Sequence, residues 1–246
     1  MTILLVSCFK DTLYFACDSR ATNRSNTNNE EIVSYIEGYP KYWLFKNKNI
    51  MVARAGTDFS WQLNINVQNT IQQGNISLNN IIQTIKKHYS SGYEQFIKRG
   101  GEGTLCFLIG GVDDKGRGYV CELKSPSFEP RWIRKKFLSQ GFVYAQGAYH
   151  ATHKNNLIRR YKELKKVKGR QIYYDRLVCE SIEEMHSSGD TTVDFPVVLA
   201  KLTKDNSYLA SYDSPPLGKN EFLQTYIPNF WRRNLFGFPL NNKKDD

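Results

Sequence analysis

The chain has 246 residues, of which 40% are hydrophobic and 24% charged, with a formal net charge of +10 at pH 7. This length suits one large domain or two small ones, and the apolar content allows a sizeable core. No stretch approaches the roughly 18–20 apolar residues of a membrane helix. We expect no signal peptide, because no basic segment precedes the first apolar run, which breaks at Lys10-Asp11. We therefore expect a soluble, cytoplasmic protein whose charge permits, without requiring, contact with anionic partners.

The first twenty residues predict a β-hairpin. Two apolar runs rich in strand-forming residues, Ile3–Phe9 and Thr12–Cys17, flank the turn. The polar residues 21–38 are interpreted as a loop or insertion. A second hairpin is predicted from Lys41–Lys46 and Asn49–Ala55.

Two helical pairs are predicted, separated by strands. The first pair begins near Asp58 and, with Ser77 as N-cap, near Leu78. The next strands are Leu105–Ile109, Tyr119–Leu123 and Trp132–Leu138. The remaining elements are a strand at Phe142–Ala145, helices at about Tyr149–Leu164 and Tyr173–His186, and a strand at Val193–Leu202.

This order, ββ, ββ, αα, βββ, αα, β, predicts an α+β fold, a four-layer αββα sandwich of two antiparallel sheets. We expect residues 1–206 to form this domain and residues 207–246 to form a C-terminal extension. The aromatic side chains of the extension pack either on the parent domain or on a neighbouring subunit. The odd number of cysteines and the lack of a Cys-x-x-Cys predict small buried thiols in a reducing compartment. They are Cys8, Cys17, Cys106, Cys121 and Cys179.

The order of motifs near the N-terminus resembles the start of a mature proteasome β-subunit. It comprises Thr2 before the first hairpin, Asp18-Ser19-Arg20-Ala21-Thr22, Lys41 before the second hairpin, and Ala55-Gly56 at its end. The resemblance extends to bacterial proteasome-like peptidases and covers most of residues 2–203. It implies an N-terminal nucleophile (Ntn) hydrolase without a cofactor, a threonine-type endopeptidase in a homo-oligomeric ring or open spiral. Peptides or unfolded proteins are the implied substrates, and an unfoldase is a possible partner.

Acyl transfer requires a nucleophile, a base and donors for the oxyanion. If Met1 is removed, Thr2 supplies a hydroxyl and an α-amine, whose pKa is ordinarily about 7.7–8.0. The resemblance places Lys41 beside Thr2, where a cation lowers the pKa of the amine. It also implies that Asp18 pairs with Lys41, and that Arg20 supports the same charge network. The backbone N–H of Gly56 is the implied oxyanion donor.

Three further assignments follow from the resemblance. Ser188 with Gly189 matches the end of the family's late Asp-x-x-Ser-Gly motif, but Met185 stands in place of the aspartate, and Glu184 could replace it with shifted spacing. Arg54 resembles the floor of the specificity pocket and predicts cleavage after acidic residues; the alternative is an outward-facing strand residue. Ala21 is the second implied substrate-binding residue.

Two other functions remain open at this stage. The chain could be a proteasome-like assembly or binding protein without activity, since folds outlive activities. A nucleic-acid-binding domain using the basic segment 159–170 is the less favoured alternative, because a basic helical face is commonly a solvated one. His150 and His153, three residues apart on a predicted helix, are interpreted as part of a solvated face rather than a metal site.

Overall fold

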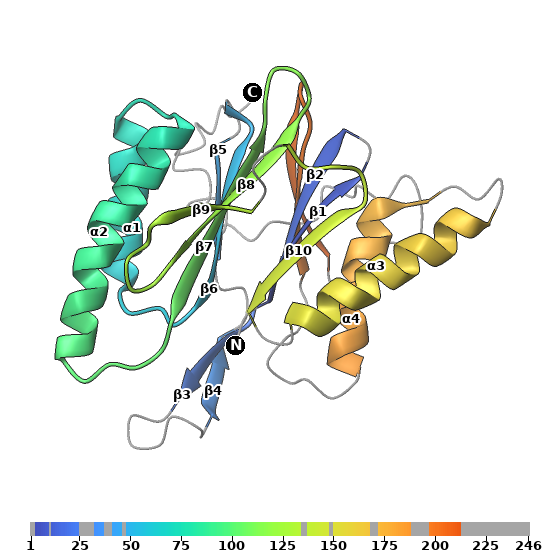
Figure 1. Cartoon of the computed structure of the whole chain (residues 1–246). Helices are drawn as coiled ribbons and strands as arrows, with labels where there is room; N and C mark the ends of the chain where they lie inside the picture. The colour runs from blue at the N-terminus through green and yellow to red at the C-terminus, as the bar shows by residue number, and fades with distance from the viewer. Residues whose placement is uncertain are drawn as a thin grey trace, which may run out of the picture.

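The computed structural model is shown in Figure 1. The residues it describes are 3–9, 11–24, 32–36, 41–45, 48–133, 137–147, 150–167, 172–187 and 197–212.

The first sheet has five strands in the order β10-β1-β2-β11-β12. Every neighbouring pair is antiparallel. In that order the strands are Phe142–Gly147, Ile3–Phe9, Thr12–Asp18, Val197–Leu202 and Ser207–Tyr212. The apolar runs of the N-terminal hairpin therefore lie at the centre of this sheet, where both faces are buried. Burial on both faces explains why β1 and β2 are apolar almost throughout rather than at alternate positions.

The second sheet also has five antiparallel strands, in the order β5-β6-β7-β8-β9. In that order the strands are Tyr42–Phe45, Ile50–Gly56, Leu105–Val112, Gly118–Lys124 and Pro130–Trp132. A separate two-stranded hairpin pairs β3 with β4. Its strands are Ala21–Arg24 and Ile32–Ile36.

Two pairs of helices cover the outer faces of the two sheets (Figure 1). Helices α1 and α2 lie on the second sheet, and α3 and α4 lie on the first. Their bounds are Trp61–Gln73, Leu78–Lys98, His150–Lys166 and Tyr174–Ser187. The predicted N-cap at Ser77 is confirmed, because its hydroxyl accepts a hydrogen bond from the backbone N–H of Asn80 at 3.2 Å. None of the described helices combines the length and apolar character needed to cross a bilayer.

Successive side chains along each strand point to opposite faces of the sheet, and the buried ones form three apolar cores. On β1, Leu4 and Val6 face the second sheet, whereas Ile3 and Leu5 face α3 and α4. A third cluster fills the space between the second sheet and α1 and α2, with Phe107 and Tyr89 among its fully buried members. The predicted α+β sandwich, with helices outside two antiparallel sheets, is therefore present. None of the five cysteines forms a disulfide, and all five are buried.

Several elements differ from those expected. The segment 21–38, which was expected to be a loop, contains the hairpin β3–β4. The many Asn, Ser and Thr residues of this segment favour a loop prediction, so its two short strands were missed. Of the expected strand Trp132–Leu138, residues 134–136 lie outside the described part of the chain, and Trp132 ends the short edge strand β9. This strand begins with Pro130, a position that proline tolerates. Strand β12 pairs with β11 along its length, so the first sheet continues six residues beyond the expected boundary at 206. Residues 213–246 lie outside the described part of the chain, and their role as an extension stays a prediction.

Candidate active site

A buried ion pair joins the ends of the two N-terminal hairpins. The Nζ atom of Lys41 lies 2.8 Å from Oδ2 of Asp18, and their side chains are 3% and 0% exposed. The other carboxylate oxygen, Oδ1, accepts a hydrogen bond of 3.0 Å from the backbone N–H of Ile3. Lys41 also donates to the backbone carbonyl of Arg20. Asp18 therefore connects the lysine ammonium to the first described residue of the chain.

Strand register brings these groups together. In the β1–β2 ladder Leu4 lies opposite Cys17, so the next residue of β2, Asp18, comes beside Ile3. Lys41 immediately precedes β5, and its carbonyl accepts a hydrogen bond of 2.7 Å from the N–H of Arg54 on β6. Figure 1 shows the start of β1 and the end of β2 at the same end of the sandwich. The second hairpin thus delivers the lysine to the N-terminal strand.

Burial and charge act on Asp18 in opposite directions. Loss of solvent raises the pKa of the carboxyl, because the charged form is poorly hydrated there. The ammonium of Lys41 and the N–H of Ile3 lower the same pKa, because both stabilise the carboxylate. Because both side chains are buried, neither charge has water as an alternative partner. The ion pair therefore holds the lysine ammonium at one position, out of contact with solvent.

Gly56 ends β6 in a conformation that requires glycine. Its φ is +112°, and a Cβ atom would lie 2.0 Å from the carbonyl oxygen of Thr104. The residue is exposed, unlike the rest of its strand. Strand β6 lies against β1 and β10 across the space between the sheets. The backbone of Gly56 therefore belongs to strand β6, which also carries Arg54. The N–H of Arg54 in turn donates to the carbonyl of Lys41.

Arg54 lies in a buried polar cluster beneath α1. The residue is 5% exposed, and its Nη2 atom is 3.1 Å from Oδ2 of Asp58. Both oxygens of Asp58 also accept hydrogen bonds from the amide of Asn64, each 3.1 Å long, and Tyr89 donates to Asn64. Burial lowers the pKa of Arg54 to about 10. The guanidinium thus already has a carboxylate beside it, which the sequence-based interpretation did not include.

A second polar cluster between the sheets was missed by the sequence analysis. Glu122 on β8 is 4% exposed, and its carboxylate accepts from Arg131 Nε at 2.7 Å and from the Tyr144 hydroxyl at 2.7 Å. Gln146 donates to the same carboxylate. Gln146 lies opposite Leu4 in the ladder between β10 and β1. The cluster therefore ties the second sheet to the strand that flanks β1. The available signal was Glu122 itself, a charged residue within the predicted strand Tyr119–Leu123.

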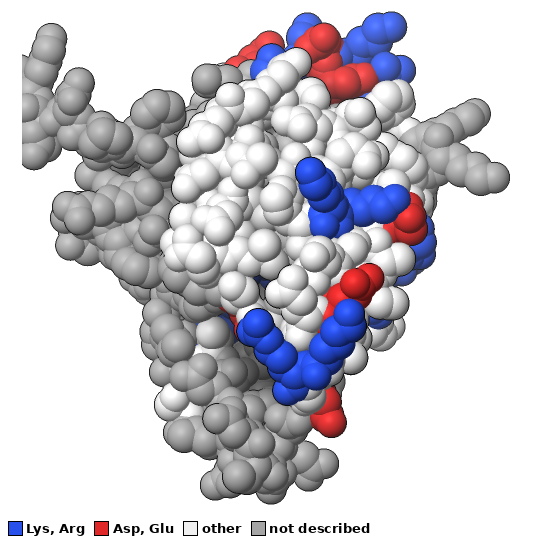
Figure 2. All heavy atoms as spheres, turned by 90° about the vertical axis from the view of Figure 1, so that its left-hand side faces the viewer, with Lys and Arg blue, Asp and Glu red and all other residues white. Residues whose placement is uncertain are grey.

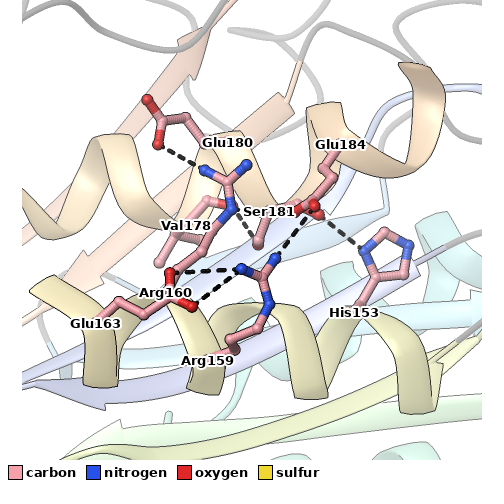
Figure 3. A network of polar contacts seen from close by, with 8 residues as sticks. All are labelled: His153, Arg159, Arg160, Glu163, Val178, Glu180, Ser181 and Glu184. Atoms are coloured by element: carbon pink, nitrogen blue, oxygen red, sulfur yellow. Dashed lines mark hydrogen bonds and ion pairs between the residues drawn. The ribbon is translucent and has the colours of Figure 1, made fainter. Parts of the chain in front are cut away.

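Other predicted residues are placed as follows. Ala21 begins β3 and is half-buried. Thr2 and Ser188 lie outside the described residues, so their roles stay predictions. Glu184 is on α4, where it binds Arg159 and Arg160 of α3 (Figure 3). It therefore belongs to the interface between these helices.

The expectation for His153 was wrong. The ring is fully buried, and Nδ1 lies 3.2 Å from the carbonyl oxygen of Ser181 on α4 (Figure 3). His150, three residues earlier, is exposed. Among the described residues, His, Cys, Asp and Glu side chains form no group of three that could hold a metal ion.

Comparisons with known proteins bear on the fold. No protein-family model matches the chain. No curated protein matches it either. Among solved structures, the chain is similar to a Gly-1 mutant of Anbu from Hyphomicrobium sp. strain MC1, with a TM-score of 0.53, 13% sequence identity and coverage of 86% of each chain. The chain is therefore similar in fold to that structure, and at this identity the likeness concerns the fold alone.

Proposed function

We propose that this protein is a threonine-type endopeptidase, active after Met1 is removed, in a homo-oligomeric proteasome-like assembly. The observation that carries the proposal is the contact of the buried Asp18–Lys41 pair with the N–H of Ile3. That nitrogen is the atom through which residue 2 joins the chain. A hydroxyl and an α-amine on residue 2 would therefore start from a point held beside a fixed cation.

The proposed reaction proceeds by acyl transfer. The Thr2 hydroxyl attacks the substrate carbonyl while its proton passes to the α-amine, which the Lys41 cation keeps partly neutral. The N–H of Gly56 donates to the developing oxyanion, an interaction whose loss typically lowers the rate by roughly 10²–10³. Collapse of the intermediate breaks the peptide bond, and the ammonium of Thr2 returns its proton to the leaving amine. Water then hydrolyses the ester and regenerates the threonine.

Substrate preference in this proposal depends on Arg54 and Asp58 together. A guanidinium favours an acidic side chain by charge and bidentate geometry. The carboxylate of Asp58 at 3.1 Å offsets part of that charge. We therefore expect a modest preference for acidic residues before the cut, with Asp58 limiting it. Peptides or unfolded proteins supplied by an unfoldase are the proposed substrates.

The decisive experiment is labelling with a threonine-directed covalent inhibitor, mapped by mass spectrometry. Intact mass is measured first, and we expect a species lighter by one methionine. The inhibitor should then modify Thr2, and Thr2→Ala should abolish both labelling and peptide hydrolysis. Thr12→Ala, a change at a half-buried threonine of β2, is the matched control and should leave both intact. A retained Met1, or labelling elsewhere, would favour an assembly protein without activity.

A further inference from the structure

One segment of this strongly basic chain carries no ionisable side chain. Residues 59–85, which include all of α1 and the start of α2, contain no Asp, Glu, Lys, Arg or His. The whole chain has 24% charged residues and a net charge of +10. A run of this length without charge is not explained by burial, because many of its side chains reach the surface. The surface they form therefore differs in character from the rest of the protein.

The exposed positions of the segment are almost all amides. These positions are exposed and have room for charged residues, but they are occupied mainly by Asn and Gln, which are neutral and form hydrogen bonds. We call them the amide face: Gln62, Asn66, Asn69, Thr70, Gln73, Gly74, Asn75, Asn79 and Gln83. Figure 2 looks at the side of the molecule formed by α1 and α2, and most of the described surface in this view is uncharged.

We propose that the amide face is where a second copy of this chain binds, through an isologous contact centred on α1. Two copies that each carry a charge of +10 repel one another unless they meet where like charges are absent. The amide face meets that condition over the described residues of 59–85. Depletion of Lys, Glu and Asp is also the compositional mark of interface cores.

The chemistry of amides selects a second copy over a different protein. In a two-fold contact the same patch faces itself, so each group must be its own complement. Asn and Gln meet this requirement because one side chain both donates and accepts hydrogen bonds, whereas a lysine facing a lysine cannot. Within one chain Gln62 donates to Asn66 at 2.9 Å. The side chains of Asn69 and Gln73 make no hydrogen bond to another described residue, so the full hydrogen-bonding capacity of both amides is available to a partner.

The first test adds charge to the amide face of the full-length protein. Asn69→Lys with Gln73→Lys places four cations in a symmetric contact. Neither change should unfold α1, because lysine has at least the helix propensity of the residues replaced and favours the last turn. We expect the dimer dissociation constant, measured by sedimentation, to rise at least ~10-fold at low salt and to recover partly at high salt. The control is Gln95→Lys on an exposed turn of α2 outside the segment, which should leave association unchanged.

The second test locates the two-fold axis. All five native cysteines are buried, so an introduced one is the accessible thiol among them. Asn66→Cys, Asn69→Cys and Gln73→Cys, treated singly with a short bismaleimide, should include at least one variant that forms a covalent dimer at high yield. Ser91→Cys on the exposed side of α2 is the control and should stay monomeric on denaturing gels.

The outcomes decide the proposal independently of peptidase activity. Loss of association in the lysine variant, together with crosslinking on α1, supports it even if Thr2 proves unreactive. A wild-type protein that is monomeric at all concentrations, or a lysine variant that associates like wild type, overturns it. Dissociation by lysine without crosslinking at any of the three positions also overturns it, because the two-fold axis then does not lie at α1.

Discussion

Ion pairs occur both between the two sheets and between α3 and α4, and they differ in burial. The Asp18–Lys41 side chains are 0% and 3% exposed. On the helix face, Arg159 is 52% exposed and binds Glu163 and Glu184 at distances of 3.2 and 3.3 Å (Figure 3). A buried pair fixes its atoms, because neither charge has water as an alternative partner. An exposed pair can exchange its partner for solvent at little cost. Only the first kind can hold a reactive geometry.

The largest expected effect is that of Lys41→Met. The change leaves the carboxylate of Asp18 buried without its cation, and we expect the free energy of unfolding to fall by about 3–5 kcal/mol. Peptide hydrolysis should be lost as well. Urea denaturation gives the stability change, and Lys86→Met is the control, because its pair with Glu129 is 34% and 62% exposed. A loss of stability no greater than in the control would contradict the role assigned to the pair.

The stability of Lys41→Met should also depend on pH. Burial already raises the pKa of Asp18 above its ordinary 3.8, and loss of the lysine removes the main opposing influence. A carboxyl whose pKa is raised in the folded state contributes stability below its unfolded pKa and loses it as pH rises. The deficit of Lys41→Met relative to wild type should therefore be small below about pH 3.8 and grow toward neutral pH. A deficit independent of pH would mean that the lysine acts through packing alone.

The second effect compares the two halves of the Glu122–Arg131 pair, whose side chains are 5% and 63% exposed. Arg131→Gln leaves a buried carboxylate that retains neutral donors, whereas Glu122→Gln leaves an arginine that water can solvate. We expect about 1–3 kcal/mol for Arg131→Gln and a smaller loss for Glu122→Gln. The inequality, measured by urea denaturation, is the test. Equal losses would show that the burial of the two partners does not set the cost.

The third effect concerns selectivity rather than stability. Asp58→Asn removes the charge that offsets Arg54 while keeping the hydrogen-bonding shape of the side chain. We expect the ratio of kcat/KM for acidic over apolar peptides to rise about tenfold, which corresponds to ~1.4 kcal/mol. Glu94→Gln, which removes an exposed carboxylate of α2 outside the amide face, is the control for a change of surface charge. A ratio unchanged by Asp58→Asn would remove Arg54 from the proposed pocket.

The fold was largely predictable from the sequence, and the candidate site only in part. Apolar runs and turns located β1 and β2, because a central strand needs both faces apolar. Strand β12 was missed because Ser207–Tyr212 is short and half-polar, as an edge strand can be. The proximity of Asp18 to Lys41 followed from the family resemblance. Glu122 was missed because no local pattern shows which strand on the opposite sheet supplies its donors.

The smallest expected effect returns to the helix face. Arg159→Gln removes two exposed ion pairs, and Arg160 still binds Glu180 at 2.9 Å and Glu184 at 3.0 Å. The free energy of unfolding should change by about 0–1 kcal/mol and should become insensitive to the substitution at high salt. The same change tests the nucleic-acid alternative, since it removes a cation from the basic segment. If it leaves stability unchanged but weakens binding of a labelled oligonucleotide, the arginine is available to phosphates. If binding is absent in wild type as well, the charges of α3 serve only to hold α3 against α4.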